Sequence, residues 1–139
     1  MEVMVKPELS MKNKYWIDKH RYYELKHFCL QYPKWKKIYS ELSYLGMSLS
    51  SIELKIRTNI PSDLTGKYAM MKSHYSYYIK LVEDAANSAD NDLNKYILKA
   101  VTEGLSYASM KTRFDIPCSR DTYYDRYRRF FWILNDTRK

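Results

Sequence analysis

The segment from Arg120 to Asn135 contains the residue types best suited to chemistry, and that chemistry is the recognition of nucleic acid. Arginine side chains can bind guanine edges or phosphates, threonine can touch a thymine methyl group, and tyrosine and lysine can hold phosphates. At about 100° per residue, a helix here places polar side chains on one side. The candidate DNA-binding residues on and beside this segment are Lys111, Arg113, Ser119, Arg120, Asp121, Thr122, Tyr124, Asp125, Arg128 and Arg129.

The same charges have a plainer interpretation. Arg126, Arg128 and Arg129 can form the solvated face of an amphipathic helix, balanced by Asp121 and Asp125. Charge alone does not separate the two interpretations. The short helix and the capped turn that precede the segment favour DNA binding, because charge and geometry then agree.

Three helices are expected to position these residues. Leu93 to Glu103 has a helical apolar stripe that ends at Gly104. Ser106 can cap a short helix that turns Ala108, Met110 and Phe114 toward a core. After a turn from Asp115 to Cys118, Ser119 can cap a helix from Arg120 to Asn135, and amides there would add a phosphate contact. The pattern predicts a helix-turn-helix unit, whose helices are held together by Met110, Phe114, Ile116, Tyr123, Tyr127 and Phe130.

The rest of the chain is also expected to be helical, because 3 Gly and 4 Pro leave few breaks and apolar residues recur at three and four residue intervals. The predicted fold is all-α, with a loosely ordered tail at 1–14 and a helical hairpin at 15–46 that bends at Pro33 and ends at Gly46. A linker at 47–66 follows. Residues 67–139 then hold a long connecting helix and the DNA-binding domain. The expected buried stripes are Tyr22, Leu25, Phe28, Cys29 and Tyr32, then Trp35, Ile38, Tyr39, Leu42 and Leu45, and Met70, Tyr77, Tyr78, Leu81 and Val82.

Composition limits the function classes. The net charge of +8 and the pI near 9.3 favour a polyanionic partner. No nucleophile elbow, glycine-rich phosphate loop or paired-carboxylate motif is present, so we expect neither an enzyme nor a cofactor. His20, His27 and Cys29 match no zinc spacing, so no metal is expected. Two distant cysteines and the lack of a long apolar run predict a reducing cytoplasm and no membrane association.

A second basic region lies near the amino terminus, where Lys12, Lys14, Lys19, Arg21 and Lys26 alternate with aromatic residues. Such interleaving can combine phosphate contacts with base stacking. The competing interpretation is an amphipathic helix with buried rings and solvated lysines, which the stripe spacing favours.

Ten residues in the last third of the chain form a pattern: Gly104, Leu105, Ser106, Ile116, Pro117, Ser119, Arg120, Thr122, Tyr123 and Tyr124. In these residues the segment resembles phage-encoded transcriptional regulators of the ArpU and RinA type, and also the promoter-reading module of sigma factors. Pro117 and Cys118 make the turn longer than in the sigma-type module. The resemblance implies control of phage late genes in the cytoplasm of a bacterial host, with duplex DNA and host RNA polymerase as partners.

A different function fits the same pattern. Small DNA-packaging subunits of phages, which are terminase-like, and assembly adaptors also combine a helix-turn-helix with an oligomerising helical region. A regulator is expected as a monomer or homodimer that selects one site, whereas a packaging subunit forms a ring with weak sequence preference.

Overall fold

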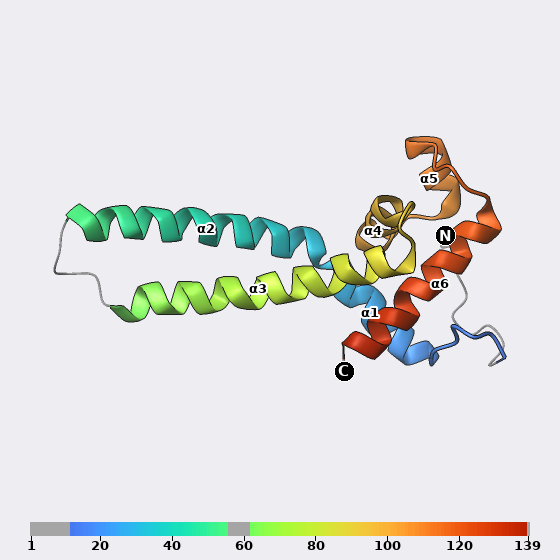
Figure 1. Cartoon of the computed structure of the whole chain (residues 1–139), viewed down its shortest axis with the longest axis horizontal. Helices are drawn as coiled ribbons and strands as arrows, with labels where there is room; N and C mark the ends of the chain where they lie inside the picture. Colours follow the sequence, from blue (N-terminus) through green and yellow to red (C-terminus); the bar gives the residue numbers. More distant parts are fainter. Residues whose placement is uncertain (1–11, 56–61, 139) are drawn as a thin grey trace. The chain divides into compact units, whose positions relative to one another are not determined.

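The structure is a computed structural model that describes residues 12–55 and 62–138, with side chains described at 12–46 and 66–138. Every regular element in these ranges is an α-helix, which confirms the predicted all-α fold (Figure 1). The helices are α1 (Lys19–Leu30), α2 (Tyr32–Lys55), α3 (Ser62–Ala89), α4 (Asn94–Glu103), α5 (Tyr107–Phe114) and α6 (Arg120–Thr137).

The chain divides into two compact units. One unit combines the chain up to Gln31 with the chain from Leu81 onward, and the other is Tyr32–Lys80. The division falls inside the predicted hairpin at 15–46, so α1 and α2 belong to different units. The predicted hairpin therefore spans parts of both units. A buried stripe indicates that a helix packs against another element, but it does not identify the helix that it packs against.

In the first unit, α1 packs against α4 and α6, and both α4 and α5 pack against α6. Aromatic rings join these helices: the Tyr22 and Phe131 centroids lie 5.1 Å apart, and those of Tyr107 and Tyr123 lie 5.6 Å apart. Arg21 on α1 also donates from Nε to Oδ1 of Asn135 at 2.7 Å. The core of this unit is Ile17, Tyr22, Leu25, Phe28, Cys29, Val82, Ala85, Ala86, Ala89, Leu93, Ile97, Ala100, Val101, Met110, Ile116, Tyr123, Tyr127, Phe130, Phe131 and Leu134.

Local signals set the helix ends of the first unit. Asp18 caps α1, because its carboxylate accepts from the backbone N–H groups of His20 and Arg21, so this helix begins at Lys19 and not at Tyr15. Gly104 ends α4 with a φ of 68°, a left-handed conformation that glycine adopts without a Cβ clash. The terminator predicted at Gly104 is confirmed.

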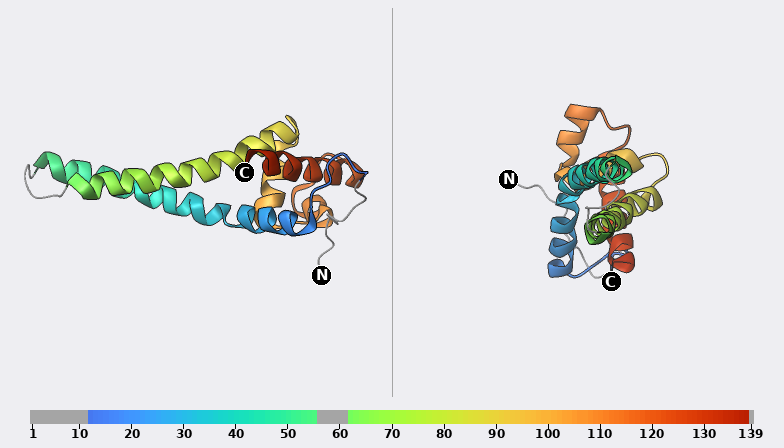
Figure 2. Two further views of the ribbon diagram at one scale, coloured as in Figure 1. Left: turned by 90° about the horizontal axis from the view of Figure 1, so that it is seen from below. Right: turned by 90° about the vertical axis from the view of Figure 1, so that its left-hand side faces the viewer.

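The second unit consists of α2 and the first part of α3, which lie side by side (Figures 1 and 2). Trp35 of α2 is buried, and its ring centroid lies 5.3 Å from that of Tyr78 on α3. Lys72 of α3 lies over the Tyr39 ring at 5.3 Å. The partner of α2 is therefore α3. Pro33 occupies the first turn of α2, as predicted, where its missing N–H costs no hydrogen bond.

Gly46 does not end a helix, which corrects the predicted boundary there. A single glycine in a helix interior costs only about 1 kcal/mol relative to alanine, and no proline follows to stop propagation. As a result, α2 runs on to Lys55 and α3 already begins at Ser62. Most of the predicted linker at 47–66 is helical. Positions 56–61 of that linker, like positions 1–11 of the predicted tail, lie outside the described residues.

The buried stripe of α3 also differs from the prediction. Met70 and Tyr77 are 75% and 57% exposed, whereas Ile79 is buried together with Val82. The buried side instead follows Ile79, Val82 and Ala86, at intervals of three and four residues. Methionine and tyrosine tolerate solvent, so the largest apolar residues were a poor guide to the buried side of this helix. The long connecting helix itself was correctly predicted.

Candidate nucleic-acid interface

Two serine caps and a short turn build the α5–α6 arrangement. The hydroxyl of Ser106 accepts from the Ser109 N–H at 3.2 Å, and that of Ser119 accepts from the Thr122 N–H at 3.2 Å. Asp115 ends α5 at a φ of 46°, which aspartate tolerates better than most residues. Ile116 is fully buried and holds the turn to the core. Both predicted caps and the predicted turn are confirmed.

Three tyrosines tie the turn, α6 and the start of α5 together. The Tyr107 hydroxyl donates to the Cys118 carbonyl at 2.8 Å, and the Tyr123 hydroxyl donates to the Leu105 carbonyl at 2.8 Å. Burial raises the pKa of the Tyr123 hydroxyl, which therefore stays protonated and able to donate. The Tyr124 hydroxyl accepts from the Tyr107 N–H at 3.3 Å. Tyr124, predicted to touch DNA, therefore also ties α6 to the start of α5.

The buried side of α6 is the predicted one, made of Tyr123, Tyr127, Phe130, Phe131 and Leu134. Ala108 of α5, which was expected in the core, is exposed, because the interior position on that helix is taken by Met110. The candidate DNA-binding residues fall into two groups. Exposed are Lys111, Arg113, Ser119, Arg120 and Asp121; half-buried are Thr122, Tyr124, Asp125, Arg128 and Arg129.

The first turn of α6 presents a mixed surface. Ser119 also donates its hydroxyl to Oγ1 of Thr122 at 3.1 Å, so the cap occupies both hydroxyls. The Arg120 guanidinium lies over the Tyr124 ring at 5.6 Å, which orients an exposed cation beside the turn. Asp121 is exposed in the first helical turn, where a negative charge stabilises the helix dipole.

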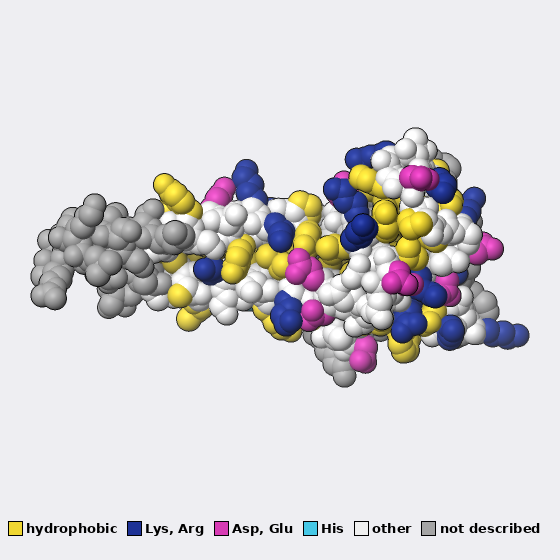
Figure 3. Space-filling model, turned by 45° about the horizontal axis from the view of Figure 1, so that its top comes forward, with side chains coloured by type: hydrophobic (Ala, Val, Ile, Leu, Met, Phe, Trp, Pro, Cys, Tyr) yellow, Lys and Arg dark blue, Asp and Glu magenta, His cyan; other side chains and the backbone are white. Residues whose placement is uncertain are grey.

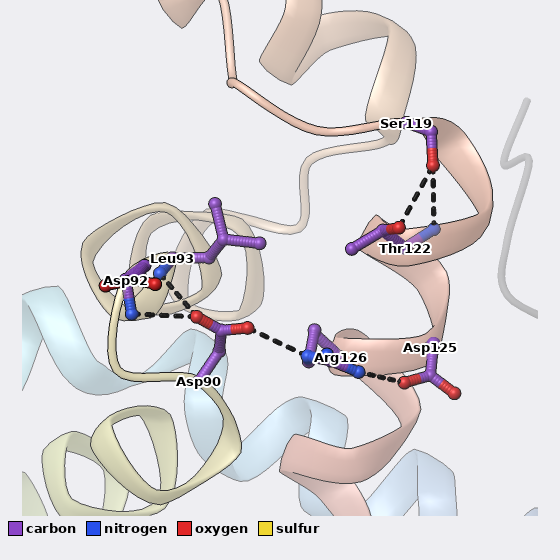
Figure 4. Close-up of polar contacts among 7 residues, drawn as sticks. All are labelled: Asp90, Asp92, Leu93, Ser119, Thr122, Asp125 and Arg126. Carbon is purple, nitrogen blue, oxygen red and sulfur yellow. Dashed lines mark hydrogen bonds and ion pairs between the residues drawn. The ribbon is translucent and has the colours of Figure 1, made fainter.

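Arg126 connects α6 to the turn between α3 and α4 (Figure 4). Its Nε donates to Oδ2 of Asp90 at 2.8 Å, and its guanidinium also pairs with Asp125. Oδ1 of Asp90 accepts from the N–H groups of Asp92 and Leu93, each at 2.8 Å. Burial would raise the Asp90 pKa, but the bonds from Arg126, Leu93 and Asp92 outweigh it and hold the pKa below its ordinary value.

The pairing with Arg126 changes the interpretation of two charged residues on α6. Asp125, a candidate DNA contact, has its carboxylate next to a cation of its own helix. Arg126 was considered only as part of a solvated face, yet it holds a contact between residues 36 positions apart in the chain. No sequence pattern indicated that Arg126 and Asp90 would pair.

Arg128 and Arg129 follow farther along α6. Both are half-buried. Within the described part of the chain, Nε of Arg128 is buried and has no hydrogen-bond acceptor. A buried donor without an acceptor is unfavourable by about 1–3 kcal/mol, so this Nε adds no hydrogen bond to the fold.

The two basic residues of α5 are exposed near the turn. Lys111 donates to the Ile116 carbonyl at 3.3 Å and pairs with Asp115 at 3.2 Å, and this carboxylate raises the Lys111 pKa. The Arg113 guanidinium lies over the Phe114 ring at 5.1 Å. Lys111 therefore already contacts the turn, whereas Arg113 extends along the surface.

Net positive charge is unevenly distributed between the two units. Residues 32–80 contain eight Lys and Arg against three Asp and Glu, whereas the rest of the chain has 16 against 13. On the face shown in Figure 3, basic and acidic side chains are interspersed around α5 and α6. On this face, a polyanion would therefore meet individual basic side chains and not a broad basic surface.

Two other kinds of site are absent from the part of the chain that the structure describes. Among the described residues, no group of three or more His, Cys, Asp or Glu side chains could hold a metal ion. No helix in the described ranges is both long enough and apolar enough to cross a membrane.

The comparisons with known proteins identified no relative of this chain. No family model matches the chain, and no curated protein or solved structure shows significant similarity to it.

Proposed function

We propose that this chain is a sequence-specific DNA-binding protein that regulates transcription, with α6 as the helix that enters the major groove. The observation that carries the proposal is the pair of serine-capped helices α5 and α6, joined at a turn held by the buried Ile116. This is the order of elements in a helix-turn-helix, whose second helix reads DNA with its first turns. A role at phage late promoters, with host RNA polymerase as partner, rests on the resemblance to the ArpU and RinA regulators.

Within this proposal, the arginines of α6 divide into two roles. Arg120, Arg128 and Arg129 contact the duplex, because none of them has a carboxylate partner among the described contacts. Arg126 instead holds Asp90 and serves the fold. Lys111 and Arg113 lie at the end of α5 next to the turn, where the first helix of such a unit meets the phosphate backbone.

The test is binding to fragments of the neighbouring genome, measured by fluorescence anisotropy across a salt series with a scrambled duplex as reference. The wild-type protein should prefer one fragment by about a thousandfold or more. Arg128→Met together with Arg129→Gln should lower the salt slope by about 1.8, or about 0.9 for each lost phosphate contact. Lys34→Gln together with Lys37→Gln, on exposed positions of α2, changes the charge equally and serves as the control.

Thermal unfolding of the same variants separates binding from folding. Since Nε of Arg128 has no acceptor among the described residues, methionine should keep the packing of the aliphatic part of the side chain and leave the melting temperature unchanged or higher. A large loss of stability would show that these arginines are structural. Equal salt slopes for the two double variants would contradict the assignment of α6 as the DNA-contacting helix.

One observation favours a second candidate, a small terminase-like packaging or assembly subunit. The helices of the second unit expose large apolar side chains, among them Tyr44, Leu45, Met70 and Tyr77, and such side chains are common where copies of a protein associate. Light scattering distinguishes the two functions. A monomer or dimer with one preferred site supports the regulator, whereas a ring with weak, uniform binding supports the packaging subunit.

A further inference from the structure

Residues 12–18, which precede α1, are held against α6. The ring of Tyr15 meets that of Trp132 with centroids 5.7 Å apart, and Ile17 is buried in the core of the same unit. A turn at Asn13 stiffens the segment: its Oδ1 accepts from the Tyr15 N–H at 2.8 Å, and its carbonyl accepts from the Trp16 N–H at 3.0 Å. This amino-terminal arm, defined as residues 12–18, therefore has a fixed place on the helix.

The place of contact lies on the side of α6 proposed to face DNA. Trp132 follows Arg128 by four residues and Arg129 by three, the spacings at which helical side chains are neighbours. Trp132 is also 45% exposed, so the ring of Tyr15 covers only part of it. The arm thus lies beside the proposed DNA-contacting arginines, about one turn farther along the helix.

The exposed charges of the arm are predominantly positive. Lys12 and Lys14 are exposed, and Nζ of Lys14 lies 5.0 Å from the centre of the Tyr15 ring. Asp18 is the single acid of the arm, and its carboxylate is occupied as the cap of α1. Asp136, one turn beyond Trp132 on α6, is the nearest exposed acid in sequence on that side.

The dimensions of the major groove of DNA determine which part of the duplex Lys12 and Lys14 would contact. The major groove is about 8.5 Å deep, whereas Trp132 lies about 18 Å along the axis from the start of α6 at Arg120. If α6 enters the groove with its amino-terminal end first, the turn that carries Trp132 lies outside the groove. Lysines at this level reach the phosphates at the groove edge and not the bases.

We propose that the amino-terminal arm is a second DNA-contacting element, in which Lys12 and Lys14 bind phosphates that flank the bases read by α6. The inference rests on the proposed DNA-binding function. The arm adds affinity and salt dependence without adding base discrimination, because phosphate contacts carry no sequence information.

The experiment compares Lys12→Gln/Lys14→Gln with Lys34→Gln/Lys37→Gln in the full chain, using the preferred duplex and a scrambled duplex. Both variants remove two exposed positive charges, but only the first pair lies on the arm. The arm variant should lower the salt slope by about 1.8 on both duplexes and leave their affinity ratio unchanged. It should also lose protection of flanking phosphates in a hydroxyl-radical footprint, whereas the control should resemble the wild type.

The outcomes separate the arm from the main proposal. If the wild-type protein binds but the arm and control variants have the same slope and footprint, the arm inference is wrong while DNA binding stands. If the affinity ratio changes instead, the arm reads bases and the phosphate assignment is wrong. If the wild-type protein binds no duplex at low salt, the proposed function fails, and the arm inference fails with it.

Tyr15→Ala provides an independent check on the anchoring of the arm. It keeps both lysines but removes the ring that meets Trp132. The flanking footprint should weaken while the central footprint stays. An unchanged flanking footprint would show that contact with α6 does not position the arm.

Discussion

The contact between Asp90 and Arg126 allows a quantitative test of how α6 is held. The Asp90 side chain is 16% exposed and accepts three hydrogen bonds of 2.8 Å: one from Arg126 and two from the backbone. A hydrogen bond to a charged group contributes about 1.5–3 kcal/mol, and loss of a backbone cap costs about 1 kcal/mol. Asp90→Ala should therefore lower the free energy of unfolding by about 3 kcal/mol.

Arg126→Met removes only part of these interactions. Asp90 keeps both backbone donors and the methionine keeps the apolar stem, so the expected loss is about 2 kcal/mol. In the double variant the losses should not add, because the two side chains share one bond, and the expected coupling is about 1–2 kcal/mol. Arg113→Met is the control, since that exposed arginine has no carboxylate partner among the described contacts, and it should change stability by less than about 0.5 kcal/mol.

The assay is urea unfolding at pH 7, followed by far-ultraviolet circular dichroism for the wild type, the single variants and the double variant. The slope m should stay constant across the set, because none of these changes alters the surface buried on folding substantially. A coupling energy near zero, with Arg126→Met as stable as the control, would refute the reasoning. Arg126 would then be a solvated arginine and would join the candidates for DNA contact.

Two further predictions concern the same unit. Phe130→Ala should cost about 3–5 kcal/mol, because the ring is fully buried; a loss below about 1 kcal/mol in urea unfolding would contradict the packing of α6. Stability should also depend on pH through Asp90, whose folded pKa lies below its ordinary value of 3.8. The folded state therefore binds the proton less readily, so this stabilisation is present above the unfolded pKa and is lost as the pH falls through the folded pKa. Urea unfolding between pH 7 and pH 3 should show a smaller loss in Asp90→Ala than in the wild type; identical pH profiles would exclude this role.

The local features of the helix-turn-helix unit could be predicted from the sequence. Ser106, Ser119 and Gly104 act through bonds to residues a few positions away, so their types and positions were sufficient to place the end of α4 and the starts of α5 and α6. The buried side of α6 could also be predicted from the sequence, because five apolar residues recur at helical spacing within this one helix. The same reasoning failed at Gly46, where no second breaker follows.

The candidate site could be predicted by residue type but not by role. Arg126, Arg128 and Arg129 look alike in the sequence, yet Arg126 pairs with Asp90 while Nε of Arg128 has no acceptor among the described residues. Tyr124 likewise could not be assigned to the Tyr107 N–H from spacing alone. The DNA-binding function of these residues stays a prediction until the binding measurements are made.

Sequence by itself determined the helical class, the caps and the buried side of α6, because each depends on neighbours within about one or two turns. Tertiary structure alone decided that α1 packs with α4 and α6, that α2 pairs with α3, and that Tyr15 meets Trp132. The physical reason is that an apolar stripe gains free energy from burial against any complementary surface. The choice among such surfaces depends on the packing of the whole chain.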